Sequence, residues 1–371
     1  MTKSSYLSLI KSFTLYPSKN SKLLNDLKYL EKLFLFHNPL NNIPYLTNLT
    51  DLYIECCYNF KFIPDLINLK TLKINYCNNI KEIPNLINLK TLKIINCQNI
   101  KEIPNLINLK YLYLENCNNI RKIPNLINLK SLEIHCCNNI KEISNLINLK
   151  KLNIDKCNNI RKIPDLINLK ILTIYDCDNI IEFSNKLFNL KSLFLDIKFS
   201  KKIIFNIPKT LINLKKIIFE CCYNFNSHNI LCNLPKTLIN LKLLNLGQCE
   251  INDFPNTLIN LKNFKLIYTN NNYNIHINLN TNLLNFYIKF LNNYIFNYND
   301  DIRTNFVIKI NINNKEKIKN YIKKTNGNVL YNINNMYDKF KSVNNGKMCI
   351  CYNNYDEKFY FSDNDNKIFI F

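Results

Sequence analysis

The chain has 371 residues, of which 47% are hydrophobic and 20% charged, so most of it has enough apolar material for a folded core and falls outside the disordered class. Its net charge of +22 favours anionic partners in general, but only three of the 49 basic residues are arginine, which disfavours specific nucleic-acid readout. Asn, Ile and Lys dominate every part of the chain, a bias typical of an AT-rich coding sequence.

Residues 1–29 precede the regular part of the sequence. They contain no basic segment followed by an uninterrupted apolar core, and no part of the chain has the ~18 consecutive apolar residues of a membrane span. We therefore expect a cytoplasmic protein that is not secreted, with residues 1–29 as an N-terminal cap over the first repeat. Fifteen cysteines without an export signal predict reduced thiols rather than a disulfide framework.

A repeat of 20 residues follows. One unit reads LKTLKINYCNNIKEIPNLIN from Leu69 to Asn88, and we number its positions 1 to 20. Apolar residues occupy positions 1, 4, 6, 12, 15 and 18, with Cys at position 9, Pro at position 16 and Asn at position 20. Positions 4 and 6 alternate as in a strand, whereas the rest of the unit fits no helical period. Each unit is predicted to be one short strand and an irregular return.

Such a unit buries its apolar side only against its neighbours, so stacked units with parallel strands are expected to form a solenoid. Twenty residues leave too little chain for a long helix on the return, and proline at position 16 fixes extended backbone there. The sequence therefore predicts an α/β-type solenoid shaped as a horseshoe, with a parallel sheet on the concave face and a mostly extended or 3₁₀ convex side.

The pattern resembles the leucine-rich repeat family, whose signature is LxxLxLxxN followed by a variable return. Leu30, Leu33, Leu35, Asn38 and Leu40 show it in nearly standard form. The resemblance covers about twelve units over residues 30–282 and implies a protein–protein interaction scaffold. FNIPKTLINLK at 205–215 also resembles the FNIP-type repeats of slime moulds and of giant viruses of amoebae, which implies a viral protein with a host factor as its partner.

Cysteine replaces the usual asparagine at position 9. A buried thiol is a small hydrophobic group with a weak donor, so it can close the turn after each strand, and we predict a structural row of thiols. A metal site is disfavoured because a single row gives an ion at most two near sulfurs, whereas zinc needs four ligands. We expect no cofactor and no metal. The row comprises Cys57, Cys77, Cys97, Cys117, Cys137, Cys157 and Cys177.

Positions 3, 5, 7 and 8 should point onto the concave face, because side chains alternate along a strand. The units differ most at these positions, as the residues at positions 5 and 7 show. Their mixture of aromatic and charged side chains suits a protein surface better than a polyphosphate. The alternative is an unselective solvated face. The candidate binding residues are Tyr53, Glu55, Tyr113, Glu115, Glu133, His135, Asp155, Tyr175 and Asp196.

Position 2 is lysine in unit after unit, at the entrance of each strand. Ammonium groups stacked at roughly 5 Å intervals would attract RNA, DNA or acidic lipid in a salt-dependent way, which is the second hypothesis. The alternative is a charged edge that only keeps the solenoid soluble. The row comprises Lys70, Lys90, Lys110, Lys130, Lys150, Lys170, Lys191, Lys215, Lys242 and Lys262.

The period fades after Asn282, and residues 283–371 are expected to form a small α+β cap. Strands are predicted at 306–312, around Val329, and at 348–352, 358–361 and 367–371, with a helix at 314–324. Three isolated glycines and four scattered histidines offer no phosphate loop or catalytic motif, so we predict no enzyme. A remote alternative is a ubiquitin-ligase-like domain, known in some bacterial repeat proteins, with Cys349 or Cys351 as the nucleophile.

Overall fold

The computed structural model describes residues 7, 9–17, 20–177, 179–180, 182–197, 204–221, 231–245, 250–251, 257–268, 275–280, 285–290, 305–311, 347–353, 358–362 and 368–370. The chain divides into two compact units, Met1–Leu187 and Phe188–Phe371. Each unit is described by itself.

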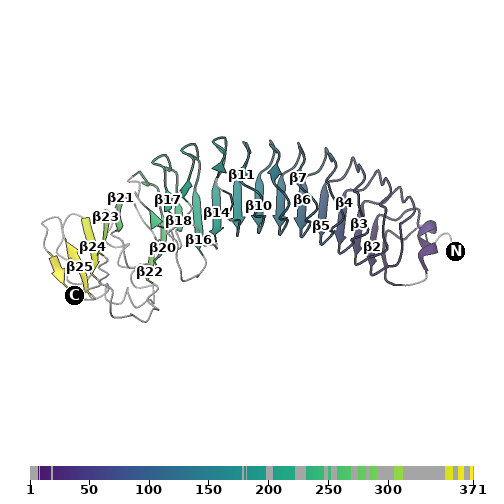
Figure 1. Ribbon diagram of the computed structural model, residues 1–371, viewed down its shortest axis with the longest axis horizontal. Helices are drawn as coiled ribbons and strands as arrows, with labels where there is room; N and C mark the ends of the chain where they lie inside the picture. The colour runs from purple at the N-terminus through teal and green to yellow at the C-terminus, as the bar shows by residue number, and fades with distance from the viewer. Residues whose placement is uncertain are drawn as a thin grey trace. The chain divides into compact units, whose positions relative to one another are not determined.

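The first unit is a stack of parallel strands, which stand side by side in Figure 1. Each strand pairs with the next one in the stack, and the register is one repeat, so that Leu72 lies beside Leu92 and Leu92 beside Leu112. A 3₁₀ helix, η1 (Asn20–Asp26), links the first two strands. In order, the strands are β1 (Ser12–Leu15), β2 (Lys32–Phe36), β3 (Asp51–Glu55), β4 (Thr71–Asn75), β5 (Thr91–Ile95), β6 (Tyr111–Glu115), β8 (Ser131–His135), β10 (Lys151–Asp155) and β12 (Ile171–Tyr175).

The core of this unit consists of rows of identical or similar side chains that run across the stack. In β6, Leu112 and Leu114 at positions 4 and 6 are buried, while their neighbours on the strand are partly exposed. Ile120 and Leu126, at positions 12 and 18 of the return, are also completely buried. The repeated apolar positions of the sequence thus form one elongated interior, and no single unit could bury them alone.

The returns are extended, as proline at position 16 predicts. Short bridges join some of them: β7 (Lys122–Ile123) pairs with β9 (Glu142–Ile143), and β11 (Lys162–Ile163) pairs with β13 (Glu182–Phe183). Among the described residues, no helix is long and apolar enough to cross a membrane.

The turns that follow β2 to β6, β8, β10 and β12 each contain a residue in the left-handed region. Position 8 has φ between 50° and 54° in eight consecutive units, although none of these residues is glycine. Apart from glycine, asparagine, aspartate and histidine enter this region most readily, so the stacked frame imposes the conformation on the cysteine, tyrosine and lysine residues. The residues are His37, Cys56, Tyr76, Asn96, Asn116, Cys136, Lys156 and Asp176.

The second unit contains three groups of strands. Parallel strands continue the repeat in β14 (Ser192–Ile197), β16 (Lys216–Cys221), β18 (Leu243–Asn245), β20 (Asn263–Tyr268) and β22 (Asn285–Phe290). The returns pair in β15 (Ile204–Asn206), β17 (Leu231–Asn233) and β19 (Glu250–Ile251). A third sheet joins β21 (Ile275–Asn280) in parallel to β23 (Asn305–Asn311) and continues antiparallel through β24 (Lys347–Asn353), β25 (Lys358–Ser362) and β26 (Ile368–Ile370).

The predicted fold class, a solenoid with a parallel sheet, is confirmed. Strands β23 to β26 occupy the segments predicted as strands near residues 306, 348, 358 and 367. The helix expected at 314–324 and the strand around Val329 lie outside the described residues. The boundaries at residues 29 and 282 stay a prediction; β1 lies before the first of them and β22 after the second.

Candidate functional site

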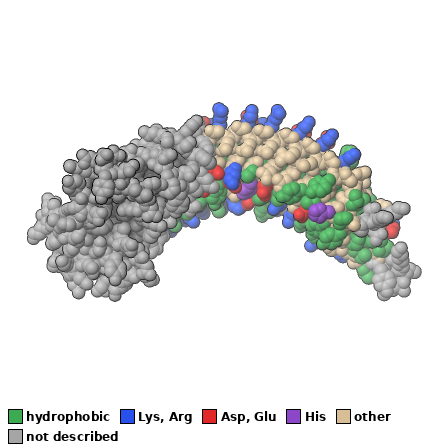
Figure 2. Space-filling model, turned by 60° about the horizontal axis from the view of Figure 1, so that its bottom comes forward, with side chains coloured by type: hydrophobic (Ala, Val, Ile, Leu, Met, Phe, Trp, Pro, Cys, Tyr) green, Lys and Arg blue, Asp and Glu red, His purple; other side chains and the backbone are tan. Residues whose placement is uncertain are grey.

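The sheet face of the first unit is the surface formed by positions 3, 5 and 7 of its strands. Most of these side chains are half-buried, because each lies against the same position of the neighbouring strands, whereas position 3 is exposed in β2, β6 and β12. Figure 2 shows hydrophobic, acidic and histidine side chains gathered on one face of the described stack. Eight of the nine candidate binding residues lie on this face; Asp196 belongs to β14 of the second unit and is buried.

An aromatic zone covers the first strands of the sheet face. We define it by Tyr16, Phe34, Phe36, Tyr53 and Lys73. The rings of Tyr16 and Phe36 are stacked with their centroids 5.6 Å apart, and those of Phe34 and Tyr53 are 4.6 Å apart. The ammonium group of Lys73 lies 4.6 Å from the Tyr53 ring centroid, within reach of a cation–π interaction. The zone is therefore a set of rings fixed against one another.

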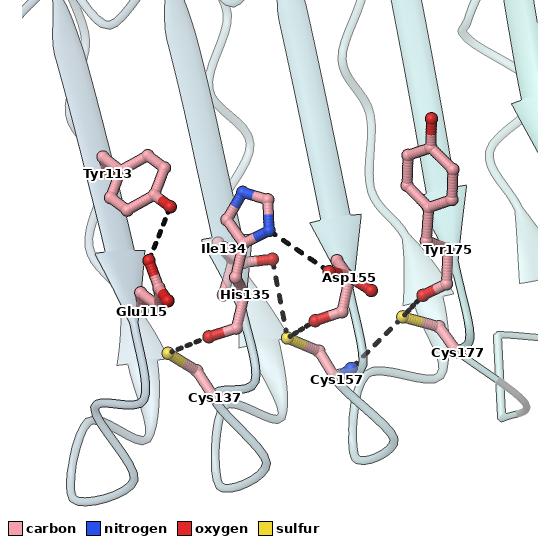
Figure 3. Close-up of polar contacts among 9 residues, drawn as sticks. All are labelled: Tyr113, Glu115, Ile134, His135, Cys137, Asp155, Cys157, Tyr175 and Cys177. Carbon is pink, nitrogen blue, oxygen red and sulfur yellow. Dashed lines mark hydrogen bonds and ion pairs between the residues drawn. The ribbon is translucent and has the colours of Figure 1, made fainter. Parts of the chain in front are cut away.

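An acidic zone follows on β6, β8, β10 and β12, and Figure 3 shows part of it. We define it by Tyr113, Glu115, Glu133, His135, Lys151, Asp155 and Tyr175. The Tyr113 hydroxyl donates a hydrogen bond of 2.7 Å to the Glu115 carboxylate. The Tyr113 ring is stacked on the His135 ring at 5.1 Å, and His135 Nδ1 lies 3.4 Å from a carboxylate oxygen of Asp155. One chain of contacts thus links three strands.

Charge and burial act together in this zone. Burial, followed by the hydrogen bond to Glu115, raises the pKa of Tyr113 above its ordinary value, so its hydroxyl keeps the proton it donates. Lys151 donates a hydrogen bond of 2.7 Å to Glu133, and the ammonium group of Lys93 lies 4.3 Å from the Tyr113 ring centroid. The surface therefore offers carboxylates whose neighbours hold them in fixed positions.

The sequence predicted that these residues share one face of the sheet, but it did not show which of them are in contact. Five members of the two zones were not among the candidate residues: Tyr16, Phe34, Phe36, Lys73 and Lys151. Tyr16 lies in the segment expected to be a cap, yet SFTLY at 12–16 aligns with KLFLF at 32–36 at the same 20-residue spacing. Lys151 stands at position 3, which the sequence also predicts to face the concave side, but its ion pair with Glu133 depends on side-chain conformations that the repeat does not specify. Among the candidates, Tyr53 belongs to the aromatic zone, and Glu55 lies at the end of β3.

The position-9 cysteines form a buried row beneath the turns that follow the strands. Each of the seven thiols donates a hydrogen bond to the carbonyl oxygen two residues earlier, at 3.0–3.3 Å. Some also accept: Cys177 Sγ lies 3.2 Å from the Cys157 amide nitrogen (Figure 3). In the first repeat, Asn38 takes this place and donates to the Tyr16 carbonyl. Within the described ranges, no group of three His, Cys, Asp or Glu side chains could hold a metal ion.

The buried thiols should resist alkylation. Burial raises the pKa of Cys77, Cys97 and Cys157 to about 12, so almost none of each is thiolate at pH 8. Cys136 is only half-buried and lies outside this row. We expect iodoacetamide to modify Cys97 at least about a hundredfold more slowly than Cys136 in the folded protein, as measured by peptide mass spectrometry. Equal rates in the folded protein would contradict the buried row, and the urea-unfolded chain, in which both thiols should react at similar rates, provides the control.

The lysines of position 2 also form a row. In the first unit, the amide of each one from Lys90 to Lys170 donates to the carbonyl of the lysine one repeat earlier at 2.8–2.9 Å. The same ladder joins Lys191, Lys215, Lys242 and Lys262 in the second unit. The side chains are exposed, apart from a half-buried Lys130. Backbone pairing therefore fixes the spacing of these charges along each unit.

Comparison with known proteins gives similarity at the level of solved structures. No family model matches the chain, and no curated protein sequence matches it. It is similar to the leucine-rich repeat domain of the type III effector XopL, with 19% identity, 63% of this chain and 76% of that chain covered, and a TM-score of 0.37. It is also similar to a leucine-rich repeat protein of Leptospira interrogans, with 20% identity, 71% of this chain and 85% of that chain covered, and a TM-score of 0.36. For InlP of Listeria monocytogenes the identity is 16%, 63% of this chain and 65% of that chain are covered, and the TM-score is 0.36.

Proposed function

We propose that the protein is a non-catalytic scaffold that binds a protein partner on its sheet face, the face that the sequence predicts to be concave. The observation that carries the proposal is the contrast between frame and surface. Positions 4, 6 and 9 repeat almost unchanged inside the stack, whereas positions 5 and 7 change from unit to unit and remain partly exposed. A regular scaffold with varied side chains on one face is an arrangement that supports selective binding.

The two zones suit different parts of one partner. Stacked aromatic rings lose little conformational entropy on binding and supply apolar contact area, as at the centres of protein interfaces. The acidic zone supplies carboxylates and a tyrosine hydroxyl that are already held by neighbours, so binding has little ordering cost. Glu115, Glu133 and Asp155 would repel a polyphosphate chain on this face, which favours a protein with basic and apolar residues.

A capture experiment tests the proposal. Replacing Tyr113, Glu115, Glu133 and Tyr175 together by alanine should remove the partner captured from cell lysate at about 0.5 M salt, where contacts between exposed charges are screened. The sequence resemblance to repeats of giant viruses of amoebae makes amoebal lysate the natural source. Capture would be read by quantitative mass spectrometry, with a loss of at least about tenfold expected for removing several central contacts.

A matched variant separates this face from the rest of the surface. Lys81, Glu82, Lys101 and Glu102 are exposed on the returns of repeats 69–88 and 89–108 of the same stack, and their replacement by alanine changes the same number of side chains. This control should retain the partner, and both variants should keep the circular dichroism and unfolding transition of the native chain. Capture that survives the sheet-face variant, or that falls equally in both variants, would contradict binding at this face.

A further inference from the structure

The two edges of the first unit differ in chemistry. The turns that follow the strands carry polar residues at positions 10 and 11, such as Asn138 and Asn139. The turns that precede the strands carry isoleucine at position 19, with lysine three residues later at position 2. We name the isoleucines at position 19 the edge isoleucines: Ile67, Ile87, Ile107, Ile127, Ile147 and Ile167. We name the lysines at position 2 the edge lysines: Lys70, Lys90, Lys110, Lys130, Lys150 and Lys170.

Each edge isoleucine lies in a tight turn that the backbone fixes. The Leu109 amide donates to the Leu106 carbonyl at 3.0 Å, so Ile107 and Asn108 are the central residues of a turn. The Asn128 side chain donates to the Ile107 carbonyl at 2.8 Å and ties this turn to the next one. The edge isoleucines therefore stand in a row at the strand spacing of about 4.8 Å, and the edge lysines stand in a parallel row.

The exposure of these apolar side chains is high and regular. The edge isoleucines keep between 38% and 49% of their surface exposed, in every one of six consecutive units. Single exposed isoleucines need no explanation, but an unbroken apolar row on a soluble surface marks a contact site. The same pattern recurs in the second unit, where Ile212, Ile239 and Ile259 are exposed and each precedes a position-2 lysine by three residues.

The charges beside this row are unneutralised within the described part of the chain. The ion pairs found there involve Lys11, Lys122, Lys151, Lys162 and Lys186, none of which is an edge lysine. A partner for this edge must therefore accept both a line of positive charge and a line of apolar side chains.

We propose that this edge binds the surface of an anionic lipid bilayer. Phosphate headgroups neutralise the edge lysines, while the edge isoleucines enter the boundary between headgroups and acyl chains. Nucleic acid would satisfy the lysines and leave the isoleucines in water. A second copy of the chain would cover the isoleucines but place like charges opposite one another. The bilayer is the occupant whose chemistry matches both rows, and this binding is independent of the partner proposed for the sheet face.

Vesicle flotation tests the edge. The full chain should float with vesicles of phosphatidylcholine containing about a third phosphatidylserine at about 0.15 M salt, and stay unbound with phosphatidylcholine alone. K90Q/K110Q/K130Q/K150Q should weaken binding roughly a hundredfold or more. The matched control K61Q/K81Q/K101Q/K141Q removes four exposed lysines from position 13 of the return and should change binding by less than about threefold.

The apolar row has its own variants. I87N/I107N/I127N/I147N should weaken vesicle binding roughly tenfold or more, whereas the valine versions of the same four changes should bind nearly as the native chain. Because the chain contains no Trp, I107W provides a single fluorophore on the edge, and its emission should shift to shorter wavelength on vesicle binding. F62W, on an exposed residue of the return, should show no shift.

Three outcomes would overturn the proposal. In the first, the edge-lysine variant binds vesicles as well as the native chain does, or its control loses as much vesicle binding as it does, which would mean diffuse charge attraction. In the second, the asparagine variant binds vesicles as well as the native chain does and single-stranded RNA displaces the vesicles, which would mean a polyanion site made of lysines alone. The third is failure of the native chain to bind either vesicle. None of these depends on capture of the sheet-face partner.

Discussion

Replacing Leu112 by alanine is expected to lower the free energy of unfolding by about 2–5 kcal/mol, as measured by urea denaturation. Leu112 is 1% exposed and lies in register between Leu92 and Leu132, whose side chains belong to the same buried row. The change removes apolar contacts on both sides and leaves a cavity that two stiff strands cannot close. Its effect should therefore extend into both neighbouring repeats.

Tyr111 provides the control on the same strand. It is 52% exposed at position 3, so its replacement by alanine should cost no more than about 1 kcal/mol. The dependence of the unfolding free energy on urea should be checked in each variant, because a stack of repeats can unfold in parts. Equal costs for L112A and Y111A would mean that β6 does not separate an interior from a surface, and the assigned core would be wrong.

Loss of three position-20 asparagines is expected to lower the free energy of unfolding by roughly 1.5–4 kcal/mol in total. Asn88, Asn108 and Asn128 each donate a side-chain hydrogen bond of 2.8–2.9 Å to the carbonyl of the residue 21 positions earlier. Alanine would leave three turn carbonyls without this partner and would remove the ties between successive turns. Thermal and urea unfolding of N88A/N108A/N128A would measure the loss.

The chain offers a close match for comparison. Asn85, Asn105 and Asn125 stand three positions earlier in the same repeats and are exposed. N85A/N105A/N125A makes the same chemical change and should alter the free energy of unfolding by less than about 1 kcal/mol. If both triple variants lose the same amount, the asparagine row is a compositional feature and not a structural one.

The sequence predicts the frame well because the frame depends on periodicity. A leucine at position 4 in unit after unit can be buried only if the units stack in register, and Leu72, Leu92 and Leu112 do so. Proline at position 16 likewise predicts the extended returns. Each of these inferences uses a residue type whose physical preference is strong and whose position repeats.

The asparagine hydrogen bonds, the left-handed turns and the contacts of the acidic zone could not be predicted from periodicity. The asparagines were attributed to a coding bias, yet those at position 20, and those at position 11 such as Asn139, which donates to the Asn118 carbonyl, form hydrogen bonds between repeats. The left-handed turn at position 8 is occupied by residues as different as Tyr76 and Lys156, so no residue type identifies it. The contacts within the acidic zone depend on rotamers, which repeat spacing does not determine.

The one-repeat register has a consequence for how such a molecule can change. Because each unit meets its neighbours through the same leucine, cysteine and asparagine contacts, a duplicated segment such as 89–108 would find matching surfaces on both sides. Unequal recombination between the near-identical stretches of its gene could thus lengthen the protein by whole modules while sparing its architecture. Each unit inserted between Lys73 and Tyr113 would move the aromatic zone about 4.8 Å farther from the acidic zone, and so adjust the size of partner that spans both.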